Sequence, residues 1–171
     1  MLQGILNLSR PKYKKYNEVL ILYLRDYICK KMAVEFIYNT NYSIQDEKRY
    51  SSWVKAVINS EKFVLGEVVF AFFDDEEMKK INLRFLKRDY YTDVICFNES
   101  KDSQINGNIA ISVDRVKDNA LTYKSEFLNE MLRVMAHGLL HCMNYSDNNE
   151  NEKMIMTNKE TEKIKMFHVE P

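Results

Sequence analysis

The hydrophobic and polar positions of this 171-residue chain follow two periods, one typical of strands and one typical of helices. Runs rich in β-branched and aromatic residues predict four strands, at 34–38, 67–73, 93–97 and 108–112. Apolar residues at helical spacing predict helices that begin near Ser43, near Asp74, after Ser112, at Glu126 and at Asn148. This order predicts an α+β domain, in which a small mixed four-stranded sheet packs with about five helices.

Polar residues mark where the predicted helices begin. Ser43 is expected to cap the first helix, and Ser112 the helix after the fourth strand. The acidic run 74–77 stands where carboxylates oppose the positive end of a helix dipole, so we assign it to capping and not to metal binding. That helix is expected to continue through Phe85, before a polar loop at 87–93. In the last helix, 148–165, the expected apolar stripe consists of Met154, Ile155 and Ile164.

Composition is typical of one soluble globular domain. The 25 basic and 25 acidic residues cancel, so the sequence indicates no general attraction to nucleic acid, although it does not exclude a local basic patch. The three cysteines, Cys29, Cys96 and Cys142, have no paired spacing, which favours a reducing compartment. The apolar run 19–24 is too short to cross a bilayer, and no later run is long enough. We therefore predict a cytoplasmic protein with no membrane contact.

Residues 1–31 differ in character from the rest of the chain. They hold Pro11, a basic cluster at 10–15 and a short apolar run, and they match no element that we can assign. Met32 is followed at once by the first predicted strand. We expect an N-terminal extension of unknown role over 1–31 and the functional domain over 32–171.

Two of the three histidines lie four residues apart in the predicted helix 126–143. Residues at this spacing lie one above the other on one helix face, so His137 and His141 could both reach one metal ion. Asn144 suits the left-handed conformation that ends a helix, and a turn there would return Asp147 to the same ion. Three protein ligands would leave a position for water, as a catalytic metal needs. The spacing therefore predicts a metal site at the end of this helix.

The same residues leave other metal chemistries open. A peptidase helix usually reads His-Glu-x-x-His with the Glu as general base, but Gly138 follows His137 and carries no base. Glu130, about two turns earlier, suits a place behind the ligands better. A site with two histidines and one carboxylate is also formally compatible with iron. Cys142 points about 100° away from His141 on the helix, so we expect it to pack in the core.

Three blocks of sequence, in one order along the chain, match a known family pattern. Residues 137–147 read His-Gly-Leu-Leu-His-Cys-Met-Asn-Tyr-Ser-Asp, where the family has His-Gly-x-Leu-His and a third ligand ten residues after the first. Residues 81–97 and 107–112 match two further blocks, and Met156 and Glu160 fall where the family tail has a Met and a Glu. Over roughly 34–164 the chain resembles the YbeY endoribonucleases.

The resemblance implies a zinc-dependent, single-strand-directed endoribonuclease that acts in 3′-end maturation of 16S ribosomal RNA and in ribosome quality control. It implies one Zn²⁺ ion at His137, His141 and Asp147, with the Asp in place of a third histidine as in Bacteroidetes-like members. The implied partners are ribosomal RNA, the small ribosomal subunit and ribosome-associated proteins. No catalytic group is assigned beyond water on the metal, and either that water or the RNA 2′-hydroxyl could attack.

The chain departs from the family pattern at Leu86, where the family has an arginine. Nearby cations that could meet RNA phosphate in its place are Arg84, Lys87 and Arg88. Arg133, one turn before His137, either supports the site from behind or meets phosphate. Glu160 is expected to hold the last helix and is given no catalytic part. Two alternative functions stay open: a metallopeptidase-like hydrolase, and a ribosome assembly factor whose metal is mainly structural.

Overall fold

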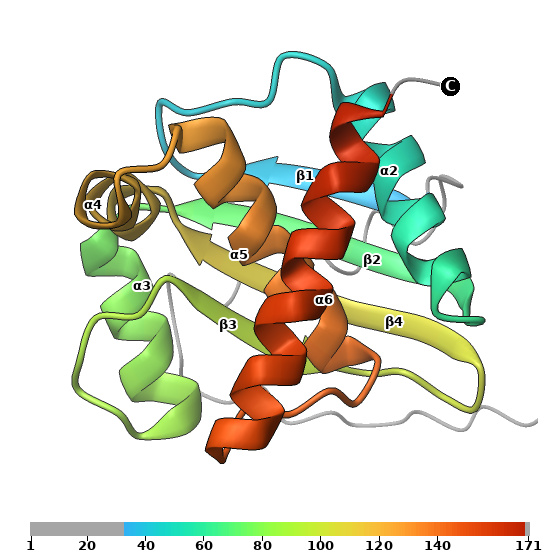
Figure 1. The fold of residues 1–171 in the computed structure, drawn as a ribbon. Coiled ribbons are helices and arrows are strands. Elements are labelled where there is room, and N and C mark those ends of the chain that lie inside the picture. The colour runs from blue at the N-terminus through green and yellow to red at the C-terminus, as the bar shows by residue number, and fades with distance from the viewer. Residues whose placement is uncertain (1–32, 170–171) are drawn as a thin grey trace, which may run out of the picture. The chain divides into compact units, whose positions relative to one another are not determined.

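The computed structural model describes residues 33–169, in which a four-stranded sheet carries helices on both faces (Figure 1). The strands are β1 (Val34–Tyr38), β2 (Val64–Phe73), β3 (Val94–Asn98) and β4 (Gln104–Ser112). The helices are α2 (Glu47–Ser60), α3 (Asp75–Ile81), α4 (Val113–Tyr123), α5 (Phe127–Cys142) and α6 (Glu150–His168), with a π-helical turn η1 (Asn82–Leu86) after α3. The predicted α+β class, with four strands and five helices in the described range, is confirmed.

The sheet is mixed, with the strand order β1-β2-β4-β3. Strands β1, β2 and β4 are parallel to one another, and β3 pairs antiparallel to β4 at one edge of the sheet. Strand β2 begins earlier than the sequence predicts, because Gly66 lies inside it and does not end it. A Cβ on Gly66 would lie 2.2 Å from the Asn106 side chain, and the register of β2 and β4 shifts between Leu65 and Val68. Glycine here permits a close approach and so continues the strand.

The helix starts agree with the prediction in two cases and differ in one. Asp74 caps α3 by accepting from the Glu77 amide (2.8 Å), and Ser112 caps α4 by accepting from the Arg115 amide (3.1 Å). The prediction of Ser43 as a cap is wrong, because Asp46 accepts from the Arg49 amide and α2 begins only at Glu47. The predicted helix through Phe85 also changes character, since α3 ends at Ile81 and η1 continues it.

The predicted apolar stripe of α6 is wrong at two of its three residues, since only Ile164 packs against the core. Met154 and Ile155 are exposed, and the buried side chains are Met156, Glu160, Lys163 and Phe167. Two of these four are charged, so the buried face cannot be recognised from hydrophobicity. Burial of charged groups is tolerated only where partners compensate for lost water, and both charges have such partners.

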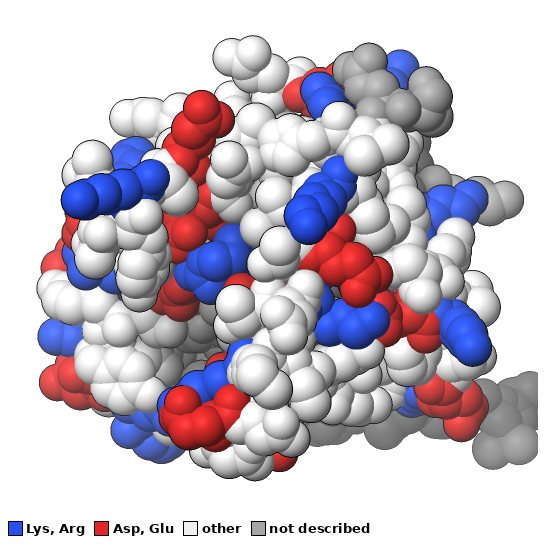
Figure 2. All heavy atoms as spheres, in the orientation of Figure 1, with Lys and Arg blue, Asp and Glu red and all other residues white. Residues whose placement is uncertain are grey.

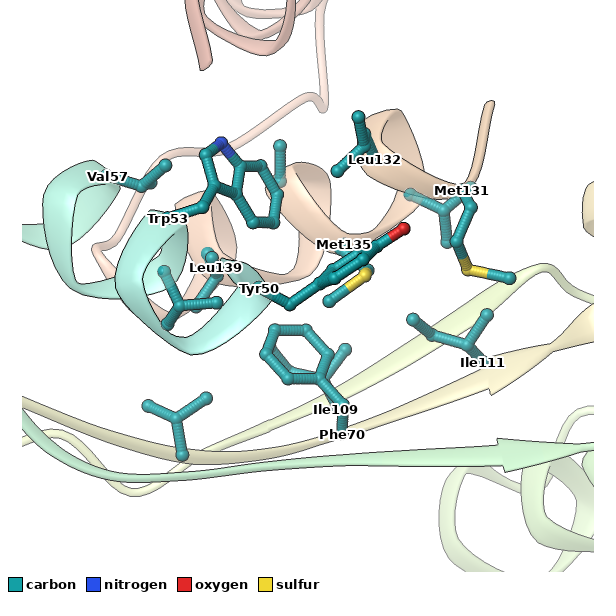
Figure 3. Close-up of a cluster of buried hydrophobic side chains, with 14 of the residues drawn as sticks. Tyr50, Trp53, Val57, Phe70, Ile109, Ile111, Met131, Leu132, Met135 and Leu139 are labelled. Carbon is teal, nitrogen blue, oxygen red and sulfur yellow. The ribbon is translucent and has the colours of Figure 1, made fainter. Parts of the chain in front are cut away.

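The main core lies between one face of the sheet and the helices α2, α5 and α6 that cover it. The strands contribute Phe70, Ile109 and Ile111 to this core (Figures 1 and 3). A smaller cluster on the opposite face packs Met78 of α3 against the sheet. Helix α5 lies close on β4 at Gly138, where a Cβ would lie 2.6 Å from the Ile109 Cγ2 atom. Within residues 33–169, no helix combines the length and apolarity that a bilayer span requires. The predicted extension over 1–31 lies outside the described residues.

Candidate metal centre

Helix α5 places His137 and His141 on one face, as their spacing predicts. The two rings stand at 85° to each other with centroids 4.4 Å apart. Their Nε2 atoms are only 2.9 Å apart, while each Nδ1 atom points away to a different partner. The ring atoms that face each other are therefore one nitrogen from each histidine.

The partners of the Nδ1 atoms determine what the Nε2 atoms can offer. The Nδ1 atom of His141 lies 3.0 Å from the Tyr145 carbonyl, which can only accept, so this nitrogen carries the proton. The Nδ1 atom of His137 lies 2.6 Å from a Glu160 carboxylate oxygen, which favours the same assignment. In neutral rings both Nε2 atoms then present lone pairs toward each other. Two lone pairs at this separation repel unless a proton or a metal ion lies between them.

The end of α5 brings a carboxylate to the same place. Asn144 adopts the left-handed conformation at φ 65°, as the sequence predicts, and the Tyr145 amide donates back to the Leu140 carbonyl. The chain then turns so that Asp147 Oδ2 lies 3.7 Å from His137 Nε2. Glu152 fixes this loop by accepting from the Ser146 hydroxyl and from the Asn148 amide.

The three side chains form a donor set that fits zinc. One ligand atom each of His137, His141 and Asp147 lie within 4.8 Å of one another. Zinc bonds of about 2.0–2.1 Å in tetrahedral geometry separate two nitrogen ligands by about 3.3 Å, close to the spacing of the two Nε2 atoms. The Asp147 side chain is 41% exposed, so the group opens to solvent on that side. Two imidazoles and one carboxylate with an open side match a catalytic zinc site better than a closed structural one.

A line of buried and half-buried charged side chains lies behind His137. Glu160, on α6, is nearly buried, and its second oxygen lies 3.8 Å from the Arg133 guanidinium. Arg133 binds Glu130 through two nitrogens, at 2.7 and 3.1 Å, and reaches Asp93 at 3.2 Å. Burial alone would lower the pKa of Arg133, but the bond to Glu130 raises it above its usual range. Arg133 therefore contacts His137 only through Glu160, and Glu130 in turn contacts Arg133.

Glu160 is the site residue that the sequence interpretation missed. The sequence predicts only that Glu160 holds the last helix, yet Glu160 contacts the ring of His137 directly. A carboxylate on the far nitrogen of a metal-binding histidine fixes the tautomer and raises the basicity of the ligand. The signal that could have revealed it is the spacing of Met156, Glu160, Lys163 and Phe167, which follows a helical period with charges inside it.

A second network stands behind His141. The Tyr145 hydroxyl donates to Glu61 at the end of α2 (2.6 Å), and Glu61 also binds Lys159 (2.8 Å) and the fully buried Lys163. Burial would raise the pKa of Glu61, but the bonds from the two lysines and Tyr145 outweigh it and lower the pKa to about 2. Burial also lowers the pKa of His141, and neighbouring His137 lowers it further, which favours the neutral, metal-binding ring.

The structure does not bring the remaining cations to the histidines. Phe85 of η1 packs on Phe97 in the small cluster on the α3 face, whereas the preceding residue on β3, Cys96, faces α5 and lies 3.1 Å from Cys142. The candidates Arg84, Lys87 and Arg88 thus lie across β3 from the metal group. The loop that follows these cations ends at Asp93, which binds Arg133 beside the metal group. Cys142 is fully buried, which confirms the prediction that it packs in the core.

Comparisons with known proteins assign the chain to a family. The family model described as endoribonuclease YbeY matches residues 36–168. A protein of Flavobacterium johnsoniae called endoribonuclease YbeY is 42% identical over 137 residues, covering 80% of this chain and 99% of the relative. One of Christiangramia forsetii with the same description is 39% identical, covering 82% and 99%.

The fold is similar to a solution structure of a protein from Thermotoga maritima. The TM-score is 0.60 at 22% identity, over 78% of this chain and 88% of that one. This likeness concerns the fold alone. The sequence matches carry the family assignment, because they span nearly the whole length of each relative. The chain belongs to the endoribonuclease YbeY family, a family of enzymes that cleave RNA.

Proposed function

We propose that this protein is a zinc-dependent, single-strand-directed endoribonuclease that acts in the cytoplasm on ribosomal RNA. The observation that carries the proposal is the convergence of two imidazole lone pairs, 2.9 Å apart, beside an accessible Asp147 carboxylate. Family membership supplies the substrate class. Maturation of the 16S ribosomal RNA 3′ end, ribosome quality control, and contact with the small subunit and its associated proteins are part of the proposal.

The residues of the chain have distinct tasks in this proposal. His137, His141 and Asp147 would hold one Zn²⁺ ion, which supplies a Lewis acid able to polarise a phosphoryl oxygen and to make water more acidic. Glu160 and the Tyr145 carbonyl hold the two rings with their Nε2 atoms forward, so no reorganisation is needed when substrate binds. Arg133 lies 3.8 Å from the second Glu160 oxygen and helps to hold this carboxylate in place. Arg84, Lys87 and Arg88 would meet phosphates further along the RNA.

The alternatives receive less support. A peptidase needs a carboxylate base beside the metal, yet Gly138 has no side chain and Glu130 is bound to Arg133. Glu160 faces Nδ1 of His137, away from the ligand side of the ring. A mainly structural metal would be needed for the fold, whereas the core contains a large apolar cluster between sheet and helices. We expect chelation to leave the domain folded.

An RNA cleavage assay tests the proposal. The full chain with zinc should cleave single-stranded ribosomal RNA fragments and spare duplexes, and chelator, His141→Ala or Asp147→Asn should reduce the rate by at least about 100-fold. His168→Ala is the matched control, because His168 contacts Asn129 away from the site. Equal inertness of zinc-loaded parent and His141→Ala would overturn the nuclease function. Unfolding on chelation would favour the assembly factor instead.

The phosphate contacts are tested separately. Arg88→Ala should weaken RNA binding and lower its dependence on salt, because each lost phosphate contact removes about 0.7 from the log–log slope for single strands. Unchanged affinity and slope would remove Arg88 from the RNA-binding set.

A further inference from the structure

An exposed aromatic and basic segment follows α3. From Lys79 to Arg88 the sequence contains five cations and no acidic residue, although the whole chain is neutral. In the same region, large apolar side chains stand exposed, and they are Leu83, Phe85, Leu86, Tyr90 and Tyr91. Exposed apolar side chains occur singly on most surfaces, but a group of five in nine residues is unusual.

The backbone holds this segment in an uncommon conformation. It begins with the π-helical turn η1 and turns at Lys87, which adopts the left-handed conformation at φ 60°. The buried Asn82 side chain donates to the Tyr90 carbonyl at 2.9 Å and so fastens the loop to the turn. The apolar side chains are therefore exposed on a fixed backbone, which favours a recognition surface.

Two of the aromatic rings have faces suited to stacking. Tyr91 is already engaged, with its hydroxyl on Glu76 and with Lys79 and Arg115 near its ring. Tyr90 is 52% exposed, and within residues 33–169 no ring or cation contact holds its side chain. Phe85 meets Phe97 at 75°, edge to face, and the Arg84 guanidinium lies over one face of its ring, 5.4 Å from the centroid, which leaves the other face for a base.

The segment is connected to the metal group at two points. Phe85 packs on Phe97, and the next residue, Asn98, directs its amide toward the His141 carbonyl (3.4 Å). At its other end, Asp93 binds Arg133, which stands behind Glu160 and His137. The segment continues from α3, and the surface in Figure 2 is hollowed between the α3 side and the N-terminal part of α6.

From these observations we infer that residues 83–91 form a base-stacking platform for single-stranded nucleic acid, with Tyr90 and Phe85 contacting bases and the neighbouring cations contacting phosphates. This inference rests on the proposed function and assigns the residues that bind the strand further along from the cleavage site. Interleaved aromatic and basic side chains suit a single strand, because unpaired bases expose the faces that stack while the phosphates remain charged. A duplex hides those faces.

Binding without cleavage isolates the platform. We would measure fluorescence anisotropy of a labelled oligoadenylate with full-length His141→Ala protein in chelator. Adding Tyr90→Ala should weaken binding between about fivefold and about 100-fold, the range for one lost stacked base, with the salt slope unchanged. Tyr90→Phe should bind as the parent does, because it keeps the ring. Tyr123→Ala is the matched control, since Tyr123 of α4 is 67% exposed and lies outside the segment.

The outcomes separate the platform from the nuclease function. Equal affinity of Tyr90→Ala and parent for the single strand would overturn the platform, even if the parent cleaves RNA. The same would follow if Tyr123→Ala weakened binding as much, or if duplex RNA lost affinity equally. A Tyr90-dependent affinity in a protein that never cleaves RNA would support the platform and overturn the nuclease. Phe85→Ala, checked for an unchanged melting temperature, should repeat the Tyr90→Ala result.

Discussion

The two histidines of α5 are four residues apart, yet the regions behind them are built differently. His137 rests directly on a carboxylate, Glu160, beside which lies Arg133, and Arg133 is in turn bound by Glu130. His141 rests on the backbone carbonyl of Tyr145. The charged residues on this side do not touch the ring: Glu61 accepts from the Tyr145 hydroxyl, and Lys163 binds Glu61. The first support acts on the ligand itself, whereas the second acts on the fold that carries the ligand.

This difference predicts that the two supports can be separated by experiment. A carboxylate on a ligand ring changes metal affinity, because it changes the basicity of the imidazole. Breaking the buried ion pair of Glu61 and Lys163, between the end of α2 and α6, lowers the free energy of unfolding, because it leaves a buried charge uncompensated. We expect the effects of substitution to decrease from Glu61 through Glu160 to Tyr145.

Glu61→Gln should have the largest effect, on stability. It removes a charged partner of the fully buried Lys163, which keeps Ser60 and Glu162 as its other contacts. We expect a loss of about 3 kcal/mol in the free energy of unfolding, at the lower end for a broken buried pair. Urea unfolding in chelator measures it, with exposed Glu67→Gln as control. A larger effect on zinc affinity than on stability would contradict the comparison.

The same carboxylate predicts an acid dependence. The pKa of Glu61 is lowered from 4.5 to about 2 in the folded protein, so its ionised form stabilises the fold above pH 4.5. That contribution is lost as the pH falls from 4.5 to about 2, because the unfolded state binds the proton first. Glu61→Gln should therefore show a smaller loss of stability over this window than the parent. Parallel curves for the two proteins would show that Glu61 does not carry the effect.

Glu160→Gln should act on zinc and only weakly on the fold. The amide oxygen can still accept from Nδ1 of His137, but the charge is gone, so we expect zinc affinity to fall by about 10–100-fold. Competition with a chromogenic chelator measures the affinity, and Glu150→Gln, fully exposed on the same helix, is the control. The comparison fails if Glu160→Gln unfolds the domain while the affinity of the folded fraction is unchanged.

Tyr145→Phe should have the smallest effect. It removes the hydroxyl that donates to Glu61 but leaves the carbonyl that accepts from His141. One lost hydrogen bond predicts about 0.5–1.5 kcal/mol of stability, and less than a roughly tenfold change in zinc affinity. Thermal unfolding and the same chelator competition measure both. A drop in affinity as large as that of Glu160→Gln would show that the two supports are equivalent.

Local sequence determined the fold class and the position of the site. Strand runs, capping residues such as Asp74 and Ser112, and the His-x-x-x-His spacing depend on neighbours within a few residues, so their physical reasons can be read along the chain. The left-handed Asn144 and the return of Asp147 follow from the same short-range geometry. The prediction of Ser43 as a cap failed because Asp46 follows three residues later, and only the backbone path selects between two nearby polar residues.

What the sequence could not determine depends on contacts between distant residues. Glu160 meets His137 across 23 positions, and Lys163 meets Glu61 across 102, so neither charge could be recognised as buried from the α6 pattern alone. The predicted strand began only after Gly66, because the neighbour that explains this glycine, Asn106, lies on another strand. The sequence by itself determined which side chains offer metal chemistry. Only the tertiary structure decided which charges stand behind them, because a buried charge is stable only beside partners that folding supplies.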